Sequence, residues 1–151
     1  MMTTELFLRY IHFISIFTIV SSLVAEGLLL KERMTRTEIG RLAKIDAVYG
    51  LASLTLLAAG LTLWLGGFGK EAAYYTKNWI FHLKLGLFAL VGILSIYPTI
   101  FFIKQRKGNA DEVVPISGKI TWMIRIELIL LAIIPLLAGL VARGTGYNYK
   151  P

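Results

Sequence analysis

Four long apolar runs dominate the pattern of hydrophobic and polar positions along the chain. They cover about residues 6–30, 45–65, 79–103 and 120–142, and each ends in charged, Gly-rich or polar sequence. A helix needs roughly 20 apolar residues to cross a bilayer core about 30 Å thick, because it rises about 1.5 Å per residue. The pattern therefore predicts an all-α integral membrane protein with four spans, in a single transmembrane domain over residues 1–151.

The connections between these runs are short and contain helix-start signals. Thr37 before Glu38 favours an N-cap that begins the second helix several residues before the membrane, and Asn78 before Trp79 is a similar signal for the third helix. Short connections favour an antiparallel, up-down-up-down arrangement. We therefore expect an antiparallel four-helix bundle.

Composition and charge narrow the chemistry. The chain is 56% hydrophobic and contains no cysteine, which excludes disulfides, thiolate metal sites, Fe–S clusters and covalently attached c-type haem. Its net charge of +7 does not indicate a nucleic-acid partner, because most of the basic residues lie in short stretches between the spans. Redox chemistry in this protein would need a bound cofactor.

The basic residues also predict an orientation. Five near the span ends belong to the side that carries the termini, whereas nine lie in the first and third connections: Lys31, Arg33, Arg36, Arg41, Lys44, Lys104, Arg106, Lys107 and Lys119. The positive-inside rule then places both termini outside. In a bacterium this means the inner (cytoplasmic) membrane with periplasmic termini, and the lipid bilayer is the first expected partner.

Ionisable side chains inside the spans carry most of the functional information, because each costs about 2.5 to 3.5 kcal/mol even on a lenient insertion scale. One stripe of the first helix, at steps of three and four, contains His12, Ser15, Ile19, Ser22 and Glu26. A face of the second helix contains Asp46, Tyr49, Gly50, Ser53, Leu57, Gly60 and Trp64. These two faces are expected to pack against each other.

Toward the basic side of the bundle, several charged residues share a similar depth, and Tyr49 lies near them. They are Glu26, Asp46, Arg125 and Glu127. One interpretation is an interhelical ion pair such as Glu26 with Arg125, and the alternative is a path for protons. Arg125 and Glu127 lie two residues apart and point to different faces, so at most one of them is expected to meet Glu26 directly.

The two histidines share a depth near the outer side. His12 lies about 9 Å below Leu6 and His82 about 6 Å below Asn78, at the rise of a helix. Two imidazoles facing each other across a bundle are a simple axial ligand set for haem b, although a buried histidine is often only hydrogen-bonded. Lys84 lies about 200° round the helix from His82, so only one of the two faces the bundle interior.

Several short runs give the chain a family resemblance. They are residues 9–12 (RYIH), 25–26 (AE), 46–52 (DAVYGLA), 84–88 (KLGLF), 95–99 (SIYPT) and 142–144 (ARG). With these runs the chain resembles the bacterial four-helix membrane proteins grouped as domain-of-unknown-function family 2214. The resemblance covers nearly the whole chain and implies the same topology.

More distantly, His12 and the stretch containing Trp79, His82 and Lys84 are similar to HemJ-type protoporphyrinogen oxidase and to CopD-like membrane domains. The HemJ-type resemblance implies haem binding and activity at His12 and Lys84. The leading hypothesis is a haem b protein with His12 and His82 as iron ligands and Lys84 beside a propionate, acting in electron transfer with a quinone or another membrane redox protein. The alternatives are a protoporphyrinogen-oxidase-like enzyme and a cofactor-free membrane scaffold, and a homo-oligomer is expected.

Overall fold

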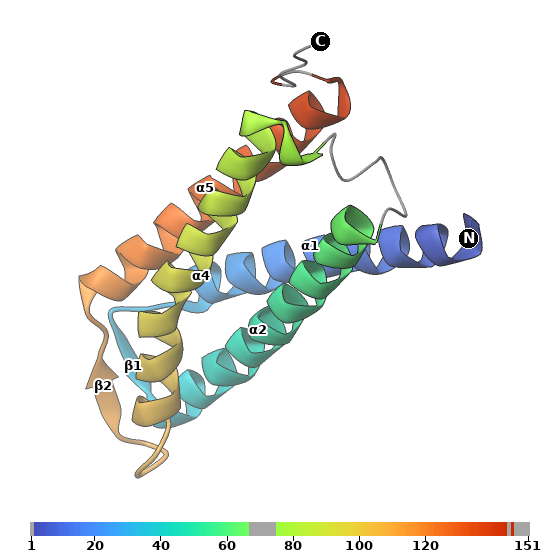
Figure 1. Cartoon of the computed structure of the whole chain (residues 1–151). Coiled ribbons are helices and arrows are strands. Elements are labelled where there is room, and N and C mark those ends of the chain that lie inside the picture. The colour runs from blue at the N-terminus through green and yellow to red at the C-terminus, as the bar shows by residue number, and fades with distance from the viewer. Residues whose placement is uncertain (1, 67–74, 145, 147–151) are drawn as a thin grey trace.

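A computed structural model describes residues 2–66, 75–144 and 146. Its elements are the helices α1 (Met2–Leu29), α2 (Arg36–Leu65), α4 (Trp79–Gln105) and α5 (Gly118–Ala142), with the strands β1 (Arg33–Thr35) and β2 (Val113–Pro115) (Figure 1). All four helices are long and apolar enough to cross a membrane. The all-α architecture with four candidate spans is therefore confirmed, and each predicted run coincides with one helix. The largest differences are at the helix starts: α1 begins at Met2 rather than near residue 6, and α2 begins at Arg36, nine residues before the second run.

The helices associate as two pairs. α1 packs mainly against α2, and α4 packs mainly against α5. The pairs come together near β1 and β2 and diverge toward the end where α1 begins and α5 finishes (Figure 1). We call these the ribbon end and the terminal end of the bundle.

The ribbon was not predicted from the sequence. β1 and β2 pair antiparallel, with Arg33 opposite Pro115, Met34 opposite Val114 and Thr35 opposite Val113. Strands of three residues are too short to produce a readable alternation of polar and apolar positions. The ribbon joins the two basic connections, so both lie at the same end of the bundle, as an antiparallel topology requires.

The start of α2 differs from the sequence prediction. The N-cap is Thr35 rather than Thr37: the Thr35 hydroxyl accepts a hydrogen bond from the Glu38 amide at 3.2 Å, and Glu38 Oε1 accepts one from the Thr35 amide at 3.1 Å. This reciprocal capping box needs the glutamate to be the third residue after the cap, a spacing that Thr35 provides and Thr37 does not. The predicted cap at Asn78 is confirmed, because its side chain accepts from the amides of Ile80 and Phe81.

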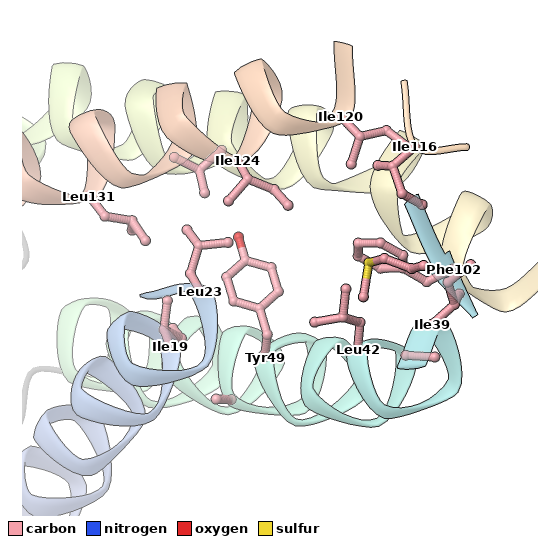
Figure 2. Close-up of a cluster of buried hydrophobic side chains, with 14 of the residues drawn as sticks. Ile19, Leu23, Ile39, Leu42, Tyr49, Phe102, Ile116, Ile120, Ile124 and Leu131 are labelled. Carbon is pink, nitrogen blue, oxygen red and sulfur yellow. The ribbon is translucent and has the colours of Figure 1, made fainter. Parts of the chain in front are cut away.

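The buried core lies between the helix pairs and extends to the ribbon. Figure 2 shows its large members, which include Ile19, Leu23, Ile39, Leu42, Tyr49, Phe102, Ile120, Ile124 and Leu131. The outward faces of the helices are also apolar: Leu28 is 80% exposed and Ile129 is 60% exposed. Apolar side chains on both the inner and outer faces are typical of a bundle surrounded by lipid.

Candidate functional site

Three carboxyl groups lie buried in the bundle interior. Glu26 of α1 and Glu127 of α5 are each 1% exposed, and Asp46 of α2 is 5% exposed. A buried carboxyl group loses its hydration and needs hydrogen bonds or an opposite charge in compensation. The partners of these three side chains therefore decide what the site can do.

Two hydroxyl groups donate to this carboxyl cluster. The Tyr49 hydroxyl donates to Oε1 of Glu127 at 3.3 Å, and the Thr99 hydroxyl donates to Oδ2 of Asp46 at 2.6 Å. The Glu26 carboxyl lies close enough to the Asp46 carboxyl to interact with it electrostatically. Since Thr99 belongs to α4, all four long helices contribute a side chain to the cluster.

One carboxyl oxygen of the cluster accepts no hydrogen bond from the described residues. Glu26 Oε1 is fully buried and has no hydrogen-bond partner among the described residues. The described part of the chain also provides no Lys or Arg ion pair to any of the three carboxyl groups, since its ion pairs are Glu5 with Arg9, Lys31 with Glu38 and Arg36 with Glu112. The cluster is acidic, and none of the described Lys or Arg residues forms an ion pair with it.

The sequence singled out five polar residues at this depth, and the structure brings four of them together: Glu26, Asp46, Tyr49 and Glu127. The fifth, Arg125, points away. It is exposed, and its guanidinium carbon lies 5.7 Å from the centre of the Trp122 ring. The expected ion pair between Glu26 and Arg125 is therefore wrong, because the two-residue spacing that turns Glu127 inward turns Arg125 outward.

Sequence reasoning missed Thr99. The sequence does place Thr99 four residues after Ser95 and next to Pro98, on a face of α4 that also contains Val91. This spacing becomes informative only when the inward face of the helix is known, because a threonine in an apolar helix does not by itself indicate a function.

The polar stripe of α1 runs from the carboxyl cluster toward the terminal end. Ser15, Ile19 and Ser22 are buried, and the predicted packing of this stripe against α2 is confirmed. At its outer end the His12 ring approaches Gly60 of α2, where a Cβ atom would lie 3.5 Å from His12 Cε1. His12 Nδ1 is buried and, within the described residues, has no hydrogen-bond partner.

The structure also decides which face of α4 is inward. Val91 and Pro98 are buried whereas Ile93 is 64% exposed, so the face that contains Lys84 is turned inward. The Lys84 ammonium lies 4.9 Å from the centre of the Phe81 ring and close enough to His12 to interact with it electrostatically.

His82 is on the outward face of α4. It is exposed, and its Nε2 lies 2.7 Å from the Thr76 carbonyl oxygen, within hydrogen-bonding distance. The structure therefore brings Lys84, and not His82, toward His12. In the part of the chain that is described, no group of three or more His, Asp or Glu side chains is arranged to hold a metal ion.

Comparisons with known proteins identify a membrane protein family. No curated protein matches the chain, and no solved structure matches it. One family model, described as "Predicted membrane protein (DUF2214)", matches residues 4–146. The match includes all four long helices and every residue of the carboxyl cluster. On this evidence the chain belongs to the DUF2214 family of predicted membrane proteins.

Proposed function

We propose that this protein handles protons within the membrane, with the carboxyl cluster of Glu26, Asp46 and Glu127 as the proton-binding site. The observation that carries the proposal is Glu26, a fully buried carboxyl group beside Asp46 with an oxygen that the described residues leave unpartnered. Two ionised carboxylates in such a place would repel each other strongly. A proton held between Glu26 and Asp46 removes this repulsion and supplies the missing hydrogen bond.

The remaining contacts favour the same assignment. Tyr49 and Thr99 donate to Glu127 and Asp46, so these two carboxyl groups are already supplied with donors. Among the described residues no hydroxyl group donates to Glu26, which makes Glu26 the best position for the exchangeable proton. The buried serines of α1 at positions 15 and 22 lie between the cluster and His12. With water molecules, this stripe would connect the cluster to the terminal end of the bundle.

The binding site is tested by infrared spectroscopy of the protein in lipid vesicles as the pH is varied. We expect a carboxylic-acid carbonyl band at neutral pH that Glu26→Gln abolishes and that Asp46→Asn shifts. Glu32→Gln is the matched control, because Glu32 is an exposed carboxyl group at the ribbon end, and it should leave the band unchanged. Absence of the band from the unaltered protein would rule out a bound proton.

Movement of the proton is tested in vesicles that contain a pH-sensitive dye and carry a potassium diffusion potential. The unaltered protein should acidify the vesicle interior faster than protein-free vesicles do, and both Glu26→Gln and His12→Ala should slow the change. The Glu32→Gln control should behave as the unaltered protein. Equal rates with and without protein would contradict a proton path, while the infrared result would still decide whether the site binds a proton.

A second candidate function is haem b binding at His12, the role expected from the sequence. The observation that favours it is His12 Nδ1, a buried imidazole nitrogen for which the described residues supply no partner. Lys84, on the same inward side, suits a haem propionate. His82 does not fit as the second ligand in this conformation, because it is exposed and its Nε2 is beside the Thr76 carbonyl. Bound haem would supply one-electron redox chemistry, with a quinone or a membrane redox protein as partner.

Absorption spectra of the purified protein, oxidised and then reduced with dithionite, separate the two candidates. A haem protein would show a Soret band that shifts on reduction and is lost in His12→Ala but kept in His82→Ala. A colourless protein after haem supply during expression would contradict the haem candidate and leave the proton assignment in place. Porphyrinogen turnover that depends on Lys84 would instead favour the protoporphyrinogen-oxidase-like alternative.

For all these functions we propose a bacterial inner membrane location with the ribbon end cytoplasmic.

A further inference from the structure

A pocket of about 540 Å³ lies at the ribbon end, between the segment that follows α1 and the first two turns of α5. Its lining includes Lys31, Glu32 and Arg33 on one side and Gly118, Trp122 and Arg125 on the other. The carboxyl cluster contributes none of the residues that line it. The pocket is thus separate from the site proposed above.

The pocket has an excess of positive charge, with three basic side chains against one carboxylate. Lys31 is held by an ion pair with Glu38 at 2.9 Å, whereas none of the ion pairs of the described residues involves Arg33 or Arg125. The N-terminus of α5, a helix of 25 residues capped by Ser117, adds the positive end of its dipole at Gly118. Two guanidinium groups that form no ion pair within the described residues therefore line one pocket together with a helix N-terminus, and Glu32 offsets only part of their charge.

The position of the pocket suits the surface of a bilayer. Trp122 is 63% exposed and holds Arg125 over its ring, and tryptophan is enriched at the level of lipid headgroups. The pocket also lies at the end where both basic connections meet. Anionic lipids bind to basic pockets of this kind on the cytoplasmic side of membrane proteins.

We propose that this pocket binds a phosphate group, presented by the headgroup of an anionic phospholipid, through Arg33 and Arg125. Guanidinium groups match phosphate oxygens with paired hydrogen bonds. Glu32 disfavours highly charged ligands and so favours a phosphodiester with a single negative charge. The same chemistry would accept free phosphate, and the experiment distinguishes the two sources.

The test is native mass spectrometry of the full chain in detergent, titrated separately with phosphatidylglycerol, phosphatidylcholine and inorganic phosphate. We expect phosphatidylglycerol to bind more tightly than phosphatidylcholine. Arg33→Gln and Arg125→Gln should each weaken phosphatidylglycerol about fivefold, since one basic residue near a headgroup contributes about 1 kcal/mol. Arg125→Lys, which keeps the charge but loses the paired geometry, should lie between Arg125→Gln and the unaltered protein.

Arg41→Gln is the matched control, because it removes one exposed positive charge near the same end without touching the pocket. It should change the affinity less than about twofold, by the weak effect of an isolated surface charge. An equal loss in Arg41→Gln and Arg125→Gln would overturn the pocket as a site. If inorganic phosphate bound with the same dependence on both arginines while the two lipids bound alike, the lipid assignment would be overturned in favour of free phosphate.

Discussion

The Thr99 hydroxyl on α4 donates a hydrogen bond to Oδ2 of Asp46 on α2 at 2.6 Å. This bond crosses between the two helix pairs, as does the bond from Tyr49 on α2 to Glu127 on α5. Packing within each pair is more extensive than packing between the pairs. Besides its proposed role in proton binding, the carboxyl cluster therefore forms hydrogen bonds that connect the two helix pairs.

Replacing Thr99 with valine tests how much the hydrogen bond between Thr99 and Asp46 stabilises the bundle. Thr99→Val keeps the shape of the side chain but leaves Asp46 without its hydroxyl donor, so the free energy of unfolding should fall by about 1 to 3 kcal/mol. Equilibrium denaturation in mixed micelles measures the change. Thr55→Val is the control, because the Thr55 hydroxyl donates to the Leu51 carbonyl of its own helix on an exposed face. If the free energy of unfolding fell equally in both variants, the hydrogen bond between Thr99 and Asp46 would not specifically stabilise the contact between the helix pairs.

Gly60 allows α1 to approach α2 beside His12. An alanine at this position would make an ordinary contact with the imidazole at 3.5 Å, so Gly60→Ala should be tolerated. Gly60→Leu adds bulk against the ring and should cost about 1 to 3 kcal/mol of stability. A leucine at Gly50, where a Cβ atom would have no neighbour within 4 Å, should cost less. The reverse order in denaturation experiments would contradict this packing.

The capping box at the start of α2 predicts the effect of two threonine substitutions. Thr35→Ala removes the side chain that accepts from the Glu38 amide and should destabilise the start of the helix by about 1 kcal/mol. Hydrogen exchange of the first-turn amides should increase in this variant. Thr35→Ser keeps the cap and should stay close to the unaltered protein. Faster exchange in the serine variant as well would show that the cap contributes little.

Position 108 requires glycine, both because of its backbone conformation and because of the nearby Arg36 side chain. Its φ of +126° is unfavourable for other residues, and a Cβ atom there would lie 2.8 Å from Arg36 Nε. The same guanidinium donates to the Gln105 carbonyl at 2.7 Å. Gly108→Ala should therefore cost about 1 kcal/mol or more. Gly118→Ala, at a position with open space, is the comparison, and equal unfolding midpoints for the two would contradict the prediction.

The ribbon end should loosen in acid. The Arg36 guanidinium hydrogen-bonds to Glu112 at 3.0 Å and holds the pKa of that carboxyl group below its usual value. A carboxyl group with a lowered pKa stabilises the folded state above its unfolded pKa, and this contribution is lost as the pH falls through the folded pKa. The protection factor for hydrogen exchange of the Arg36 amide, which bonds to the Glu112 carbonyl, should therefore fall on acidification, so that the amide exchanges faster than its base-catalysed intrinsic rate at that pH predicts.

Glu112→Gln provides the matching variant for this pH effect. This substitution should remove the extra effect of acid on exchange at Arg36, because the glutamine side chain cannot titrate. At neutral pH the Arg36 backbone amide should exchange slightly faster in the variant than in the unaltered protein. Glu32→Gln removes another exposed carboxyl group near the ribbon end and should keep the acid sensitivity. If the Glu112 variant and the unaltered protein responded to acid alike, the ion pair would not be the cause.

The sequence by itself determined the four helices, their antiparallel order and four of the polar residues that turn inward. Twenty-residue apolar runs can satisfy their backbone in lipid only as helices, and charged side chains in such runs avoid hydrocarbon. Glu26, Asp46, Tyr49 and Glu127 were recognisable for that reason. Asn78 was recognisable as a cap because capping depends on neighbouring residues alone.

Only the tertiary structure decided which of these residues meet. Rotation of a helix about its axis is set by packing against its neighbours, so the sequence left His82 and Lys84 as alternatives, and the structure turns Lys84 inward. The same rotation separates Arg125 from Glu26 and brings Thr99 to Asp46. The pairing of β1 with β2 depends on two connections that are far apart in the chain. These relationships arise from contacts between distant segments, which local patterns of polar and apolar residues do not encode.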